Sequence, residues 1–174
     1  TEFARAVGAA RSGEVERARQ ALARLTRIQQ VTKETQKGFD WATQIEIQRL
    51  AASGWLAQAE GNKEEALRLL RAAADLEDST SKHPVTPGAL LPAREQLADL
   101  LMELGDPSAA LGEYESALQI QPGRYNSLRG AAIAAERLGK REGATELRAG
   151  LAAQCQPGDG QRAELVRMVA VPWQ

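Results

Sequence analysis

The sequence predicts an all-α fold built from repeated helical hairpins. Four glycines, each followed five residues later by alanine, recur along the chain at Gly13, Gly61, Gly105 and Gly139. The last two are 34 residues apart, and the earlier intervals are 48 and 44 residues. Glycine where one helix ends and alanine inside the next, at a recurring spacing, are typical of stacked helix–turn–helix units. Apolar residues at helical spacing between the glycines indicate the same fold class.

The unit between Pro92 and Pro122 contains the clearest hairpin. Its first helix is predicted from apolar residues at i, i+3, i+4 and i+7, which are Leu97, Leu100, Leu101 and Leu104. Gly105 can adopt the left-handed conformation that ends such a helix. Asp106 is then expected to cap the second helix, with Pro107 in its first turn, where no backbone donor is missed. Asn62 and Glu65 form a similar predicted cap pair in the preceding unit.

The small and aromatic residues of this unit resemble those of the tetratricopeptide repeat (TPR) family, whose motif is 34 residues long. The matching positions are Ala98, Gly105, Ala110, Tyr114, Ala117 and Pro122. The second unit matches through Leu50, Gly54, Ala57, Gly61, Ala66, Leu70 and Ala73. The fourth matches through Ala132, Ala135, Gly139, Ala144, Leu151 and Pro157, and the first through Ala6, Ala9, Gly13, Ala18 and Leu22. The resemblance implies one domain over residues 1–174: a right-handed solenoid of four hairpins at roughly 1–37, 38–78, 89–122 and 123–157, with a C-terminal capping helix.

Two intervals between units exceed the repeat length. In the first, we expect residues 27–40 to lengthen both flanking helices, with a break near Gly38, because Trp41, Ile45 and Trp55 indicate an early start of the following helix. In the second, residues 78–91 are rich in proline and are predicted to form a loop.

A ninth helix is predicted at residues 159–171. Asp159 can cap it, Pro172 ends it, and its apolar face would comprise Leu165, Val166 and Val169. A solenoid needs its last repeat covered, so this segment is interpreted as the capping helix.

The composition excludes several classes of function. A net charge of −1 gives no electrostatic reason to expect nucleic acid or a membrane surface as a partner. No apolar run is long enough for a membrane span, and no metal-ligand spacing or phosphate-binding glycine loop is present. The single histidine, His83, and the single cysteine, Cys155, are far apart in the sequence. We therefore expect a soluble protein without enzymatic activity, metal or cofactor, whose compartment, cytoplasm or periplasm, the sequence leaves open.

The resemblance also implies a concave groove lined by the first helix of each hairpin. The residues that match its inward positions are Gln48, Trp55, Gln58, Glu95, Asp99, Met102, Asn126, Arg129 and Ile133. Co-chaperone TPR domains use lysine and asparagine there to hold a C-terminal carboxylate, and this chain has alanine, tryptophan and acidic residues instead. An acidic wall with Arg129 opposite suits a helix or a basic peptide. Alternatively, Trp55, Met102 and Ile133 belong to the core, and the protein's own segments fill the groove.

The loop around His83 and Thr86 is a second candidate contact site. His83-Pro84 and Thr86-Pro87-Gly88 indicate a stiff polar turn. The loop either packs over the hairpins, with His83 bonded to a backbone carbonyl, or contacts a partner. A metal or catalytic role for His83 is a third alternative.

These observations predict a protein–protein interaction or scaffold module that binds a peptide or helix in a concave groove. The alternative is a structural C-terminal segment of a larger helical-repeat protein, with any catalytic or metal site upstream. The stretches from Glu46, from Lys82 and from Leu91 resemble the C-terminal part of larger bacterial TPR proteins. We therefore expect the chain to be a fragment, with upstream repeats as one possible partner.

Overall fold

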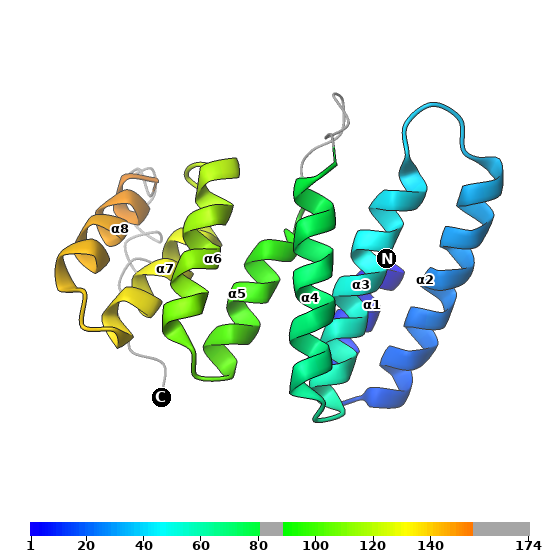
Figure 1. The fold of residues 1–174 in the computed structure, drawn as a ribbon, viewed down its shortest axis with the longest axis horizontal. Helices are drawn as coiled ribbons and strands as arrows, with labels where there is room; N and C mark the ends of the chain where they lie inside the picture. Colours follow the sequence, from blue (N-terminus) through cyan, green and yellow to red (C-terminus); the bar gives the residue numbers. More distant parts are fainter. Residues whose placement is uncertain (81–88, 155–174) are drawn as a thin grey trace, which may run out of the picture. The chain divides into compact units, whose positions relative to one another are not determined.

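Helices account for all the regular secondary structure of residues 1–80 and 89–154, the part of the chain that the computed structural model describes (Figure 1). The all-α prediction is therefore confirmed for these residues. Two compact units are present, Thr1–Leu101 and Met102–Gln174. The helices are α1 (Glu2–Arg11), α2 (Val15–Thr35), α3 (Trp41–Ala59), α4 (Lys63–Asp78), α5 (Ala93–Glu103), α6 (Pro107–Ile120), α7 (Tyr125–Arg137) and α8 (Arg141–Gln154).

The same short turn connects the helices of each pair. Three residues separate α1 from α2, α3 from α4, α5 from α6 and α7 from α8. The middle residue is a glycine with positive φ in each case: Gly13 (81°), Gly61 (82°), Gly105 (83°) and Gly139 (71°). A side chain at such a φ would be strained, so glycine is the residue that allows the chain to turn this sharply. The predicted role of the four glycines is confirmed, and the architecture is that of repeated helical hairpins.

In two hairpins, a predicted side-chain cap is present at the start of the second helix, α6 in one and α4 in the other. Asp106 accepts a hydrogen bond from the N–H of Ala109 at 3.0 Å, and Pro107 is in the first turn of α6. Asn62 accepts one from the N–H of Glu65 at 3.2 Å. Each cap satisfies a backbone donor that the helix itself leaves unpaired.

In the first unit, α1 packs against α2 and α3, and α3 packs against α2 and α4. Alanine provides much of the buried surface, which allows the helix axes to approach closely. Helices α3 and α4 approach closely at Gly54 on α3, where a Cβ atom would lie 2.8 Å from Cγ of Leu70 and 3.2 Å from the carbonyl oxygen of Ala66. Since that oxygen belongs to the backbone of α4, the α3–α4 contact depends on glycine at this position.

Helix α5 is attached to this unit through its N-terminal turns. The N–H of Ala93 donates a hydrogen bond to Oε2 of Glu77 at 2.7 Å. Arg94 forms ion pairs with Asp78 at 2.6 Å and with Asp75 at 3.2 Å, both on α4.

The long first interval lengthens α2 and α3, as predicted. They comprise 21 and 19 residues and are separated by a short connection in which Gly38 has a φ of 79°. Asp40 then caps α3 by accepting a hydrogen bond from the N–H of Thr43 at 3.0 Å. Both helices continue past the N-terminus of α1 (Figure 1).

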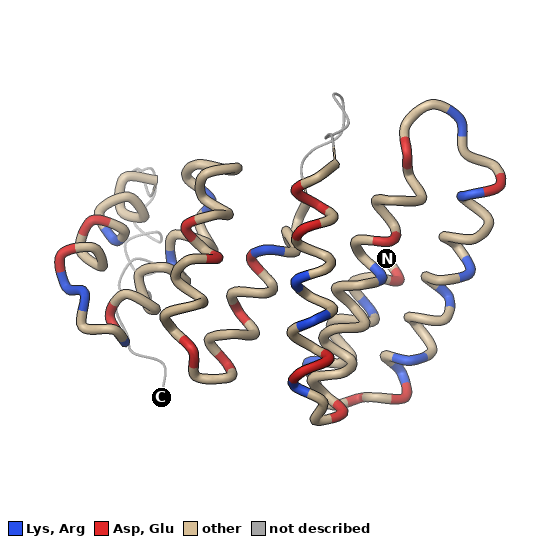
Figure 2. The backbone as a smooth tube through the Cα atoms, viewed as in Figure 1, with Lys and Arg blue, Asp and Glu red and all other residues tan. Residues whose placement is uncertain are grey.

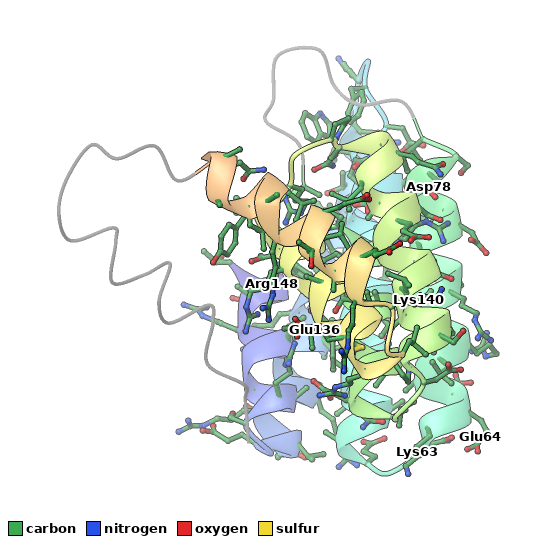
Figure 3. All side chains as sticks on the ribbon, turned by 90° about the vertical axis from the view of Figure 1, so that its left-hand side faces the viewer. Lys63, Glu64, Asp78, Glu136, Lys140 and Arg148 are labelled. Carbon is green, nitrogen blue, oxygen red and sulfur yellow. The ribbon has the colours of Figure 1, made fainter. Side chains whose placement is uncertain are left out.

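In the second unit, α7 packs against α6 and α8. The ring of Tyr114 on α6 is buried against Gly130 on α7, which has no side chain to obstruct it. Glu136 on α7 and Arg148 on α8 form an ion pair at 2.5 Å (Figure 3).

The proline-rich part of the second interval, including His83 and Thr86, and the predicted helix at 159–171 lie outside the described residues.

Candidate functional site

The predicted groove residues of the first unit lie on α3 and α5. These helices are neighbours, because Nε1 of Trp55 on α3 donates a hydrogen bond to Oε1 of Gln96 on α5 at 2.9 Å. Gln48 is exposed, and Gln58 and Asp99 are partly exposed. Trp55 and Glu95 are buried, each with 2% of its surface exposed. The first helices thus present polar side chains to solvent and keep the large aromatic ring beneath them.

A cation–π contact also holds Trp55, and its hydrogen-bond partner Gln96 is itself fixed by a second hydrogen bond. The guanidinium carbon of Arg11, on α1, lies 4.3 Å from the ring centroid, which is cation–π geometry. Gln96, which accepts the indole hydrogen bond, also donates to the carbonyl oxygen of Leu91 at 2.9 Å. Three helices therefore meet at this ring, which favours the core interpretation that the sequence left open for Trp55.

Gln58 differs from its neighbours in hydrogen bonding. Its side-chain Oε1 is buried and has no hydrogen-bond partner among the described residues. A buried acceptor without a partner costs about 1–3 kcal/mol, so it marks a place where a donor from outside would be favourable.

The remaining groove candidates, Met102, Asn126, Arg129 and Ile133, belong to the second unit. Asn126 is exposed, and the other three are partly exposed. The carbonyl oxygen of Met102 accepts a hydrogen bond from Arg137 on α7 at 3.4 Å. Within this unit the side chains of Met102 and Ile133 therefore remain accessible, unlike Trp55.

A surface that the sequence reasoning missed lies where α2 and α3 continue past α1. We call it the overhang surface: Ile28 and Val31 on α2 with Trp41 and Ile45 on α3. Ile28 is 46%, Val31 54% and Trp41 40% exposed, and Ile45 is partly exposed. Apolar residues at i and i+3 in a helix that extends beyond its hairpin partner are the sequence signal that could have revealed it.

Beside this surface, α2 and α3 are joined by a polar cluster. Nε2 of Gln29 donates a hydrogen bond to Glu46 at 2.6 Å, and Arg49 donates two more, at 2.7 and 2.6 Å. The Arg49 guanidinium lowers the pKa of the Glu46 carboxyl, the Gln29 amide acts in the same direction, and partial burial opposes them.

The lowered pKa of Glu46 predicts a contribution to acid sensitivity. Because the folded carboxyl binds its proton less readily than the unfolded one, its contribution to stability is fully present above the unfolded pKa, about 4.3. That contribution is lost as the pH falls through the lower, folded value. Glu46→Gln should reduce the free energy of unfolding at neutral pH and make its decline below about pH 5 shallower. Urea unfolding at a series of pH values measures both effects.

Glu34→Gln is the matched control for this prediction. Glu34 is exposed on α2 and forms no ion pair with a described residue. An equal change in the acid profile of the two variants would contradict the role assigned to the Glu46 cluster.

No metal site is evident among residues 1–80 and 89–154, where no three histidine, cysteine or acidic side chains are grouped suitably. In the same residues, no helix combines the length and apolarity that crossing a bilayer requires. Comparison of the sequence with models of known protein families and with curated proteins finds no match.

Proposed function

We propose that the chain is a non-catalytic, TPR-like module that binds a peptide or helix of another protein on the face formed by its first helices. The observation that carries this proposal is the arrangement of α1, α3 and α5 in the first unit. α1 packs against α3, and α3 is bonded to α5 through Trp55 and Gln96. Gln48, Gln58 and Asp99 remain accessible above this packed layer.

The composition of this face suits peptide recognition. Amide side chains can donate to and accept from a peptide backbone, and the partly exposed carboxylate of Asp99 favours a basic ligand residue. Repeated hairpins form an extended surface because each one contacts only its neighbours, which is how helical-repeat proteins bind long ligands. The TPR-like solenoid and its concave groove are part of this proposal.

Affinity capture from a lysate of the source cells tests the proposal. The native chain is compared with a Gln48→Lys/Asp99→Lys variant, in which the groove loses its accessible carboxylate, that of Asp99, and gains two cations. We expect the native chain to retain a partner and the variant to lose it, while circular dichroism shows unchanged helix content.

A Gln30→Lys/Glu64→Lys variant is the control, because it introduces the same charge change at exposed positions on α2 and α4. Equal loss of the partner from both variants would argue against the groove. If the native chain captures nothing, the alternative of a structural segment in a larger helical-repeat protein is favoured.

A further inference from the structure

The overhang surface begins beside the N-terminus of α1. Nε of Arg24 on α2 forms an ion pair with Glu2, the first residue of α1, at 2.7 Å. Because α2 turns back along α1 after Gly13, the residues of α2 that follow Arg24 extend beyond the start of α1 (Figure 1). The N-terminal part of α3 also extends beyond the start of α1 (Figure 1).

Two apolar stripes, one on α2 and one on α3, border the space that α1 would occupy if it extended beyond its N-terminus. Ile28 and Val31 follow Arg24 at i+4 and i+7, so they lie on the side of α2 that meets α1 one turn earlier. On α3, Trp41, Ile45, Ala52 and Trp55 recur at i, i+4, i+11 and i+14, which places them along one side of the helix. Arg11 of α1 covers Trp55 at the far end of this stripe, whereas Trp41 is 40% exposed. The two stripes therefore continue the surface against which α1 packs.

The way α1 packs on α2 indicates which partner fits the uncovered part of α2. On the covered part, α1 brings the acidic Glu2 to Arg24 and buries its own Ala6, Val7 and Ala10. One turn before Val31, Arg27 is exposed and forms no ion pair with a described residue. Figure 2 marks the positions of lysine and arginine along the backbone of α2 in blue. This helix carries five basic residues, Arg17, Arg19, Arg24, Arg27 and Lys33, against two acidic ones, Glu16 and Glu34.

We propose that the overhang surface binds an acidic amphipathic helix of a partner protein, which lies antiparallel to α2 as α1 does. Its apolar face covers Ile28, Val31 and Trp41, and its carboxylates meet Arg27 and the open side of Arg24. A helix in a groove between two helices is a common mode of peptide recognition, and charge complementarity fixes its orientation. Ile28, Val31 and Arg27 lie on α2, which carries no groove residue, so this proposal does not depend on the proposed groove.

A peptide titration followed by amide NMR tests the proposal. The probe is a synthetic amphipathic helix with leucine on one face and glutamate along the edge of that face. Its length is roughly 14 residues, because shorter helices are barely stable in isolation. The matched peptide has lysine in place of each glutamate. We expect shifts at the amides of Ile28 and Val31 and at the Trp41 indole with the acidic peptide, and weaker binding of the basic one.

Variants of the protein test the named contacts. Val31→Asp should weaken the binding of the acidic peptide by about tenfold or more, because it removes apolar surface that the bound peptide would cover. Arg27→Glu should weaken it about three- to tenfold and should improve the binding of the basic peptide. Ile120→Asp on α6 and Arg71→Glu on α4 introduce the same changes at other exposed positions and should leave the affinity unchanged.

Three results would overturn the proposal: equal binding of the two peptides, no effect of Val31→Asp, or shifts confined to other helices. A dilution series of the protein without peptide tests whether a second copy of this chain occupies the surface. If the Ile28 and Val31 signals shift with protein concentration and sedimentation shows a dimer, a second copy of this chain covers the surface instead.

Discussion

Replacing Trp55 with alanine is expected to lower the free energy of unfolding by about 3–5 kcal/mol, the usual cost of removing a large aromatic side chain from a core. The ring is 2% exposed, it donates a hydrogen bond to Gln96, and Arg11 lies over its face. Its removal leaves a cavity where three helices meet, and it leaves Oε1 of Gln96 without the indole donor. Urea unfolding followed by circular dichroism measures the loss without relying on tryptophan fluorescence.

Two further variants separate the terms that contribute to this loss. Trp55→Phe retains an aromatic ring but leaves Oε1 of Gln96 without its donor. The unpaired acceptor should lower the free energy of unfolding by about 1–3 kcal/mol, in addition to the cost of the smaller ring. Arg11→Ala retains the indole hydrogen bond and removes the cation above the ring, for about 0.5–2 kcal/mol. Trp41→Ala is the control for tryptophan content. Because Trp41 is 40% exposed, its removal should cost clearly less than that of Trp55.

The Trp55 result bears on function. If Trp55 were a ligand anchor, Trp55→Ala would abolish partner capture and leave stability nearly unchanged. If it is core, capture and stability should decline together. Equal stability losses for Trp41→Ala and Trp55→Ala would contradict the core interpretation.

Gly130→Ala is expected to destabilise the second unit, although alanine is the better helix former. A Cβ atom at this position would lie 2.3, 2.5 and 2.7 Å from three ring atoms of Tyr114. That ring is only 2% exposed and cannot move away without disturbing the α6–α7 contact. Overpacking typically costs about 1–3 kcal/mol and outweighs the roughly 1 kcal/mol gained in helix propensity. Thermal and urea unfolding provide the measurement.

Gly112→Ala and Gly143→Ala are the matched controls. Nothing lies within 4 Å of a Cβ atom at either position, so both substitutions should be neutral or stabilising by up to about 1 kcal/mol. Shortening the opposing side chain provides a rescue test. In a Tyr114→Leu background, Gly130→Ala should cost less than in the native chain, because the three ring atoms are gone. A cost that does not depend on residue 114 would show that the steric explanation is wrong.

Local signals in the sequence were sufficient to place the hairpin turns and several helix ends. The positive φ of Gly61 and Gly105 and the caps formed by Asn62 and Asp106 depend only on residues adjacent in the chain. The lengthening of α2 and α3 around Gly38 was predictable for the same reason, since helical periodicity is a property of a single segment.

The candidate sites could be predicted only in part. The TPR resemblance assigned Gln48 to the groove, and its side chain is exposed on α3, as that assignment requires. The two interpretations of Trp55 were indistinguishable from periodicity, which places a residue on a face of a helix but does not say what covers that face. Arg11, distant in the sequence, and Gln96, on a different hairpin, bury the ring.

The sequence by itself determined the helical class, the turn glycines and the capped helix starts, because these depend on backbone conformation and on neighbours along the chain. Only the tertiary structure decided which side chains are left uncovered. Ile28 follows the buried residues Ala21 and Leu25 on the same side of α2, yet it is exposed, because α2 extends past the start of α1. Exposure depends on where the neighbouring helix begins and ends in space, and no single segment carries that information.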